Sequence, residues 1–168
     1  MESNINKIWM DAFNERCSKY HITSILLDDY SSCVYQLEDN RELRITVNTR
    51  MYNFAKVLKS KDYKHVAKIY DCFKMVLPSQ SEEEQNVFCI VSERLNRNFQ
   101  SHTIKQSAIN LFRNIWSDYL RSYHRLEIPE DVSIEKAYAN RDAKGRKYVL
   151  NRINSSGQRY NRYSHFIK

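Results

Sequence analysis

The stretch ILLDDYSSCVYQL, residues 25–37, holds the pattern that decides the fold. Three apolar residues lead into a short polar run, and Val34 and Tyr35 then resume the apolar pattern. This rhythm predicts a strand, a polar connection and a second strand. A unit of this kind can cover a phosphate group, but phosphate loops use glycine so that backbone N–H groups can approach closely. This stretch contains no glycine, so the sequence raises the question of whether such a loop has lost its chemistry.

The composition is that of a folded protein. The chain has 168 residues, 42% of them hydrophobic, which is long enough for one domain with a sizeable core. No apolar run approaches the roughly 18–20 residues of a membrane span. The N-terminus does not resemble a secretory signal, and four cysteines lie far apart without a CxxC pair. We therefore expect a cytoplasmic protein with reduced cysteines, no metal site and no cofactor.

The positive charge is concentrated at the C-terminus when the chain is divided near residue 140. The net charge is +7, yet residues 1–140 hold 19 Lys and Arg against 19 Asp and Glu. The last 28 residues hold eight basic residues and a single acid, Asp142. This segment is also rich in aromatic residues, a combination that can contact phosphates and stack on bases.

Hydrophobic periodicity predicts an α+β order of elements around the opening stretch. We expect a helix over 4–20, strands over 21–27, 33–38 and 43–48, and a short helix over 50–61. In the third strand Leu43 and Ile45 alternate with Arg44 and Thr46, which predicts a half-buried strand with Arg44 facing solvent. The alternative is that Arg44 reaches inward as a substitute cation.

The second half predicts two further strands, a long helix and a hairpin. The strands are expected over 65–77 and 87–95, joined by the polar loop PSQSEEEQN. The clearest helix runs over about 103–124, and a hairpin follows over 136–151. The acidic run at 81–85 is interpreted as a solvated loop, with a docking patch for a basic partner as the alternative.

This order of elements resembles that of a protein kinase core, and particular residues carry the resemblance. ILLDDYSSCVYQL aligns with the glycine-rich loop of that family without a gap, so that Leu27, Asp29 and Ser32 fall on its three glycine positions. KHVAKIYDCF (64–73) resembles the segment entering the fourth strand, and VFCIVSERL (87–95) resembles the fifth strand and hinge. Ser92 then falls at the gatekeeper and Glu93 at the first hinge position.

The resemblance implies a four-part chain that is similar to the small bacteriophage-type kinases but truncated and degenerate. A helix over 1–20 would pack on a kinase N-lobe over 21–96, which has a five-stranded antiparallel sheet and one helix. A reduced C-lobe over 97–153 would contain the long helix and the β-hairpin, and 154–168 would form a basic aromatic tail. Asp131 falls on the catalytic base, although a competing register aligns NRDAK (140–144) there instead.

The chemistry that phosphoryl transfer requires is altered at nearly every aligned position. Leu27 and the two aspartates after it would block and repel phosphates. Thr46 replaces the lysine of the charge clamp, and Phe54 replaces its glutamate partner. Lys136 and Asn151 replace two metal ligands, so that a cation stands where Mg²⁺ needs an oxygen. Only Asp131 survives, as a vestigial base or as a turn or cap residue.

Three functions follow from these observations. The first is a catalytically inactive pseudokinase that acts as a protein-binding or regulatory module, with an unknown protein partner. The second is nucleic-acid binding through segment 141–168. The third is an active enzyme with an unorthodox use of nucleotide. For the second function the candidate contacts are Lys144, Arg146, Lys147, Arg152, Arg159, Tyr160, Arg162 and Tyr163.

Overall fold

The computed structural model describes residues 5–27, 32–95, 106–123 and 166, and it has an α+β fold. The described elements are α1 (Ile5–Arg16), β1 (Ile22–Leu27), β2 (Ser32–Leu37), β3 (Glu42–Thr46), α2 (Thr49–Ser60), β4 (Ile69–Pro78), β5 (Glu84–Ser92) and α3 (Gln106–Tyr123). The chain forms two compact units, Met1–Asn96 and Arg97–Lys168. Each unit is described by itself.

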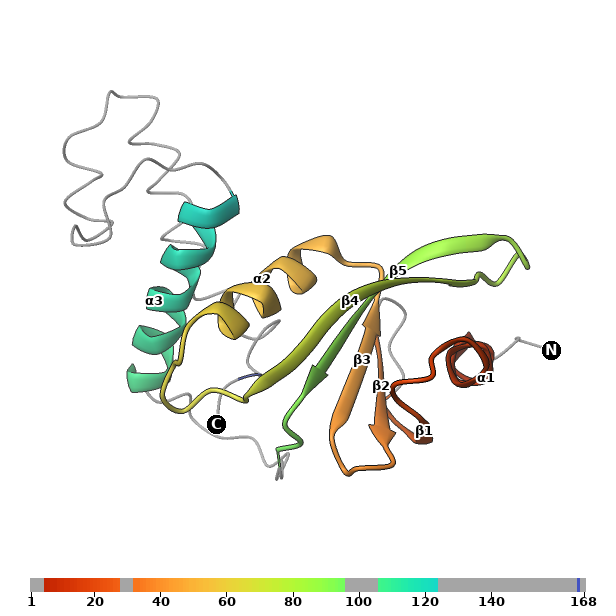
Figure 1. Ribbon diagram of the computed structural model, residues 1–168. Coiled ribbons are helices and arrows are strands. Elements are labelled where there is room, and N and C mark those ends of the chain that lie inside the picture. Colours follow the sequence, from red (N-terminus) through yellow and green to blue (C-terminus); the bar gives the residue numbers. More distant parts are fainter. Residues whose placement is uncertain (1–4, 28–31, 96–105, 124–165, 167–168) are drawn as a thin grey trace, which may run out of the picture. The chain divides into compact units, whose positions relative to one another are not determined.

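The first unit is built on a five-stranded antiparallel sheet in the order β1-β2-β3-β5-β4 (Figure 1). The first three strands form a meander, and the turn between β2 and β3 is closed by Asn40 in the left-handed region, with φ 64°. Asparagine tolerates this backbone conformation better than most residues. β3 lies at the centre of the sheet, and β1 and β4 form its two edges. The predicted five-stranded antiparallel sheet is confirmed.

One face of the sheet packs against α1 around a continuous apolar core. Trp9 and Phe13 of α1 meet the alternate residues of the strands that point toward the helix, such as Tyr35 and Leu43. Trp9 Nε1 also donates a hydrogen bond of 2.9 Å to the Pro78 carbonyl, at the end of β4. Figure 1 shows α1 and α2 on opposite sides of the sheet. Trp9, Ala12 and Phe13 are buried on this side of α1, and the predicted first helix is confirmed over Ile5–Arg16.

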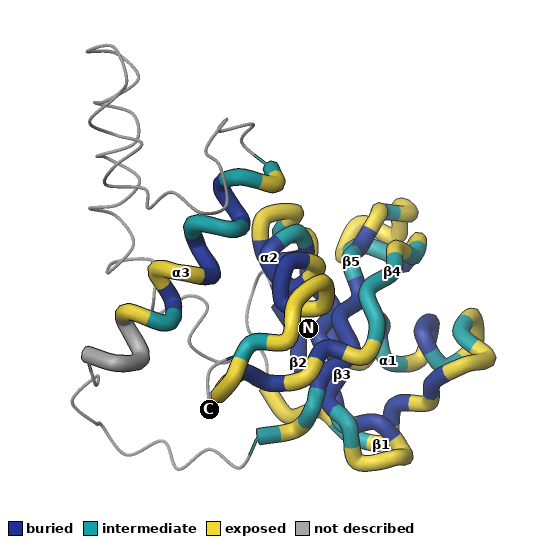
Figure 2. Tube along the Cα trace, turned by 60° about the vertical axis from the view of Figure 1, so that its left-hand side comes forward, coloured by how far each residue is buried: buried dark blue, intermediate teal, exposed yellow. Residues whose placement is uncertain are grey.

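The other face of the sheet packs against α2. The helix begins after Asn48, whose side chain accepts hydrogen bonds from the N–H groups of Arg50 and Met51. This N-cap satisfies donors that would otherwise lack partners in the first turn. Toward the sheet, Tyr52 stacks on Phe88 of β5 with 4.8 Å between ring centroids. In Figure 2 the buried residues follow the central strands and the inner side of α2.

Several predicted boundaries were wrong. The first helix ends at Arg16 and not at 20, because Tyr20 and Ile22 are buried in the sheet region. β4 begins at Ile69 and not at 65, since His65 has φ 60° and cannot start an extended strand. The predicted loop over 78–86 is mostly a hairpin: Glu84 pairs with Pro78, and only residues 79–83 turn. Polar side chains are compatible with this part of the hairpin because the two strands pair through backbone hydrogen bonds, which do not depend on the side chains.

The second unit contributes one described helix, α3. Its aromatic residues recur at helical spacing, so that Phe112, Trp116 and Tyr119 form consecutive ring contacts with centroids 5.8 and 4.8 Å apart. Arg121 bonds Asp118 one turn earlier at 3.1 Å. The predicted long helix is confirmed over Gln106–Tyr123. The predicted hairpin lies outside the described residues, and of the predicted tail only Phe166, which is buried, is described.

Candidate functional site

The aligned cleft positions of β2 and β3 lie next to one another on the sheet face that carries α2. Ser32 is paired with Thr46, and Val34 is paired with Arg44. Because directly paired residues point to the same face, these four side chains form one patch. Glu42 and Ser92 extend the patch across β3 and β5, where they are register partners. We call Ser32, Glu42, Arg44, Thr46 and Ser92 the buried polar cluster; all five are buried.

Arg44 is the centre of the buried polar cluster. Its residue is only 6% exposed, and its Nη1 donates a hydrogen bond of 2.7 Å to Ser32 Oγ. Its Nη2 lies 3.9 Å from Glu42 Oε1, and both side chains of this ion pair are buried. The prediction that Arg44 faces solvent on a half-buried strand was therefore wrong. Since α1 covers one face of β3 and α2 the other, all five residues of the strand are buried.

The two positions of the expected charge clamp carry no charge. Thr46 is fully buried, and its Oγ1 accepts a hydrogen bond of 3.0 Å from the Asn48 N–H, which helps to form the turn into α2. Phe54 is fully buried within α2. A hydroxyl and a hydrocarbon thus stand where the resemblance implies an ion pair. Neither group can hold a phosphate in place of a lysine.

Two more aligned positions take part in local structure. Leu27 ends β1 with 48% of its surface exposed, and Asp29 lies outside the described residues. Glu93 joins the end of β5 to the chain entering β4: its N–H donates to the Lys68 carbonyl at 2.8 Å. Its Oε2 accepts from the Lys68 N–H at 3.1 Å. The N–H at the first hinge position is therefore already used within the protein.

The remaining predicted site residues all lie outside the described residues. They are the vestigial base Asp131, the altered ligand positions Lys136 and Asn151, and the candidate nucleic-acid contacts Lys144, Arg146, Lys147, Arg152, Arg159, Tyr160, Arg162 and Tyr163. Their roles stay predictions. Within the described part of the chain, no group of histidine, cysteine and acidic side chains could hold a metal ion. None of the helices described there is long and apolar enough to span a membrane.

Asp71 on β4 is a contact point that the sequence did not indicate. Its Oδ2 accepts hydrogen bonds from Lys19 Nζ at 2.7 Å and from the Tyr20 hydroxyl at 2.9 Å. Its Oδ1 lies 3.6 Å from Lys59 Nζ of α2. Burial raises the pKa of Asp71, but the hydrogen bonds from Lys19 and Tyr20 outweigh it, and the pKa is lowered overall. Asp71 therefore links the α1–β1 connection to α2 across the edge strand.

The four cysteines are free, and two of them are unreactive by environment. Burial raises the pKa of the Cys72 thiol to about 11, although Lys59 and Lys56 act in the opposite direction. Burial also raises the pKa of Cys89, which lies in the apolar core under α1. Because the thiolate is the nucleophile, neither residue is a candidate for catalysis at neutral pH.

Comparisons with known proteins add no family to this description. No protein-family model matches the chain, and no curated protein matches it.

Proposed function

We propose that this protein is a catalytically inactive, kinase-like module that acts by binding another protein. The order of its elements supports the proposal, because a meander of three strands, a helix and two further strands is what the resemblance implies. The sheet is antiparallel throughout. The helix between the third and fourth strands, α2, packs against β3, β4 and β5 of this sheet. The proposal does not depend on the C-terminal half of the chain.

The observation that carries the proposal is the burial of Arg44 against Ser32. The resemblance places an alanine of the adenine pocket at Arg44 and the adenine-stacking valine at Val34, its register partner. Here Arg44 is buried, and its guanidinium bonds the hydroxyl of Ser32, which the resemblance places at a glycine position. A purine base could enter only if Arg44 left its hydrogen bond and lost its nearby carboxylate. The adenine side of the cleft is thus closed by the protein itself.

The edge strand β1 is the surface that we assign to the protein partner. Ile25, Leu26 and Leu27 are all exposed on this strand, which has a neighbour on one side only among the described strands. The N–H and carbonyl of Ile22 bond the Asn14 side chain, so the apolar stretch 25–27 is the part of this edge that can act as a template for an added strand. An extended segment of the partner would extend the sheet beyond β1.

Nucleotide binding is tested by thermal unfolding with ATP, with and without Mg²⁺. A ligand with a Kd of about 0.1 mM, added at about 1 mM, stabilises a protein by about 1.4 kcal/mol. For a chain of this size that is a rise in Tm of about 3–5 °C. We expect no rise. Tripolyphosphate is the control, because a basic protein can bind any polyanion; a rise with ATP that tripolyphosphate does not reproduce would refute the closed cleft.

Protein binding is tested by affinity capture from the native host with matched surface variants. Ile25→Lys/Leu26→Lys places two charges on β1, and we expect it to lose a protein that the wild type retains. Val76→Lys is the control, since Val76 is also an exposed apolar strand residue but lies on β4, the opposite edge. If both variants release the partner equally, or if neither does, the assignment to β1 is wrong.

A further inference from the structure

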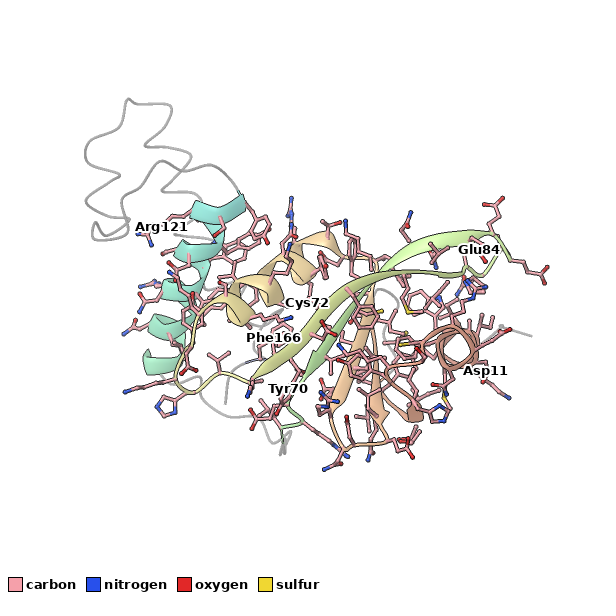
Figure 3. All side chains as sticks on the ribbon, viewed as in Figure 1. Asp11, Tyr70, Cys72, Glu84, Arg121 and Phe166 are labelled. Atoms are coloured by element: carbon pink, nitrogen blue, oxygen red, sulfur yellow. The ribbon has the colours of Figure 1, made fainter. Side chains whose placement is uncertain are left out.

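A strip of exposed cations and aromatic rings runs along β4, at the edge of the sheet opposite to β1. Charge is unevenly distributed in the first unit, even though residues 1–140 contain equal numbers of basic and acidic residues. The segment 50–74 contains seven basic residues, all exposed, and only two acids, Asp62 and Asp71. The basic residues are Arg50, Lys56, Lys59, Lys61, Lys64, Lys68 and Lys74. The acidic residues gather elsewhere, at the turn of the β4–β5 hairpin, near the Glu84 that Figure 3 labels.

The upper part of the strip is built where α2 meets β4 and β5. Tyr52 and Phe88 stack on each other, and a lysine lies over each ring. Lys56 Nζ is 5.7 Å from the Tyr52 centroid, and Lys74 Nζ is 5.8 Å from the Phe88 centroid. Within the described part of the chain, no carboxylate forms an ion pair with Lys56 or Lys74. Lys56 and Lys74, which form no ion pair among the described residues, thus lie over the stacked rings of Tyr52 and Phe88.

The lower part of the strip surrounds Tyr70, which is 39% exposed at the start of β4. Lys68 Nζ and the Arg41 guanidinium lie 5.3 and 5.0 Å from its ring centroid, and Arg41, which is partly exposed, is also ion-paired with Asp39. Asp71, between the two parts, is already shared by Lys19 and Lys59. Tyr70 and Cys72, both labelled in Figure 3, mark this course along β4. We call the following residues the β4-edge strip: Lys19, Arg41, Tyr52, Lys56, Lys59, Lys68, Tyr70, Lys74 and Phe88.

We infer that the β4-edge strip binds single-stranded nucleic acid. Its lysines would contact successive phosphates, and Tyr70, the exposed ring, would stack on a base. Alternation of cations with aromatic rings is the composition that binds single strands without sequence preference. The inference is independent of the proposed pseudokinase function, because the strip shares no residue with β1 or with the buried polar cluster. An edge strand lined only to prevent aggregation needs lysines but not an exposed aromatic ring such as Tyr70 beside them.

The salt dependence of binding measures how many phosphates the strip contacts. If four lysines neutralise four phosphates of a single strand, the logarithm of the affinity falls with a slope of about −2.8 against the logarithm of salt. Raising the salt from about 50 to about 200 mM would then weaken binding about 50-fold. Lys56→Gln/Lys74→Gln removes two of these contacts, so the slope should fall to about −1.4 and the same salt change should weaken binding about sevenfold.

The experiment uses the full chain and fluorescein-labelled oligo(dT) and oligo(U) of about 20 nucleotides, followed by anisotropy. Lys7→Gln/Arg113→Gln is the matched control, since it removes two exposed cations outside the strip and has the same total charge as Lys56→Gln/Lys74→Gln. We expect wild-type binding and an unchanged slope in the control. Tyr70→Ala should weaken binding at least about fivefold, whereas Tyr70→Phe, which keeps the ring, should not. Circular dichroism of each variant confirms that it is folded.

Three results would overturn the inference. One is the absence of binding at low salt. Another is binding that Arg159→Gln/Arg162→Gln abolishes while Lys56→Gln/Lys74→Gln leaves the slope unchanged, because the C-terminal segment would then be the binding site. The last is binding of poly(L-glutamate) through the strip without any binding of either oligonucleotide, which would identify an acidic protein segment as its partner.

Discussion

Replacement of Arg44 by methionine tests the buried polar cluster directly. Methionine keeps most of the apolar stem of arginine but removes the guanidinium, so the cavity that it leaves is small. The change removes the 2.7 Å hydrogen bond to Ser32 and the cation 3.9 Å from Glu42. If Arg44 were solvated, as its place on an alternating strand suggested, the same change would be nearly neutral. A buried Arg44 and a solvated Arg44 therefore predict measurably different losses in the free energy of unfolding for this variant.

The expected loss follows from these two contacts. A hydrogen bond that involves a charged group contributes about 1.5–3 kcal/mol to stability. The gross attraction across 3.9 Å is about 4 kcal/mol at an effective dielectric constant of about 20, and desolvation of the guanidinium cancels much of it. Loss of the cation removes the positive charge 3.9 Å from the buried carboxylate of Glu42. We expect Arg44→Met to lower the free energy of unfolding by about 2–4 kcal/mol.

Urea unfolding followed by circular dichroism and tryptophan fluorescence gives this free energy. Arg50→Met is the control, because Arg50 is an exposed arginine on the first turn of α2, and its change should stay within about 0.5 kcal/mol. The double variant Arg44→Met/Glu42→Gln removes both charges and should be destabilised by less than the sum of the single variants. Additive effects, or a loss of less than about 0.5 kcal/mol in Arg44→Met, would contradict a buried ion pair.

Three further predictions concern the rest of the first unit. Asp71→Asn should lower the free energy of unfolding at neutral pH by about 1 kcal/mol, since Lys19 and Tyr20 lose a charged acceptor. The pKa of Asp71 is lowered below its usual 3.8 in the folded state, so this stabilisation is present above pH 3.8 and is lost as the pH falls through the folded pKa. The free energies of unfolding of variant and wild type, measured against pH, should therefore converge in acid. Asn48→Ala should cost about 1 kcal/mol in urea unfolding and Asn48→Asp much less, because aspartate also caps helices; equal losses would contradict the N-cap. Alkylation of Cys72 by iodoacetamide, followed by mass spectrometry, should accelerate about tenfold per pH unit between about pH 7 and pH 10, whereas a plateau below pH 9 would contradict a pKa of about 11.

Periodicity in the sequence predicts the elements of the first unit because each strand buries alternate residues under α1. Tyr35, Leu37, Leu43 and Ile45 alternate with other residues, and all four pack in the core under that helix. The same pattern cannot show whether a second helix covers the opposite face. α2 does so, and Arg44 on that face is consequently buried. The expectation for Arg44 was wrong because a polar residue was taken to be exposed, whereas both faces of β3 are covered by helices.

The start of β5 and the charge of the β4 edge were missed for related reasons. Glu84, Gln85 and Asn86 are strongly polar, yet a hairpin can be extended by backbone hydrogen bonds alone, which side-chain polarity does not reveal. The charge balance over 1–140 conceals a basic region because the acids of the hairpin turn cancel it in the sum. The density of lysine over 56–74, counted in a shorter window, is the signal that could have indicated the strip.

The buried polar cluster and the β4-edge strip make opposite use of positive charge. In the cluster, Arg44 is buried, bonded to Ser32 and close to a carboxylate, so it can meet no external anion without breaking contacts that stabilise the sheet. Along the strip, Lys56 and Lys74 are exposed and lie on aromatic rings, so an anion can approach them without any rearrangement of the fold. A phosphate-bearing molecule should therefore bind at the β4-edge strip and not at the buried polar cluster. The double variant Lys56→Gln/Lys74→Gln tests the point: it should weaken the binding of ATP as well as that of oligo(dT), whereas ATP binding that this variant leaves unchanged would place a nucleotide site beside Arg44 instead.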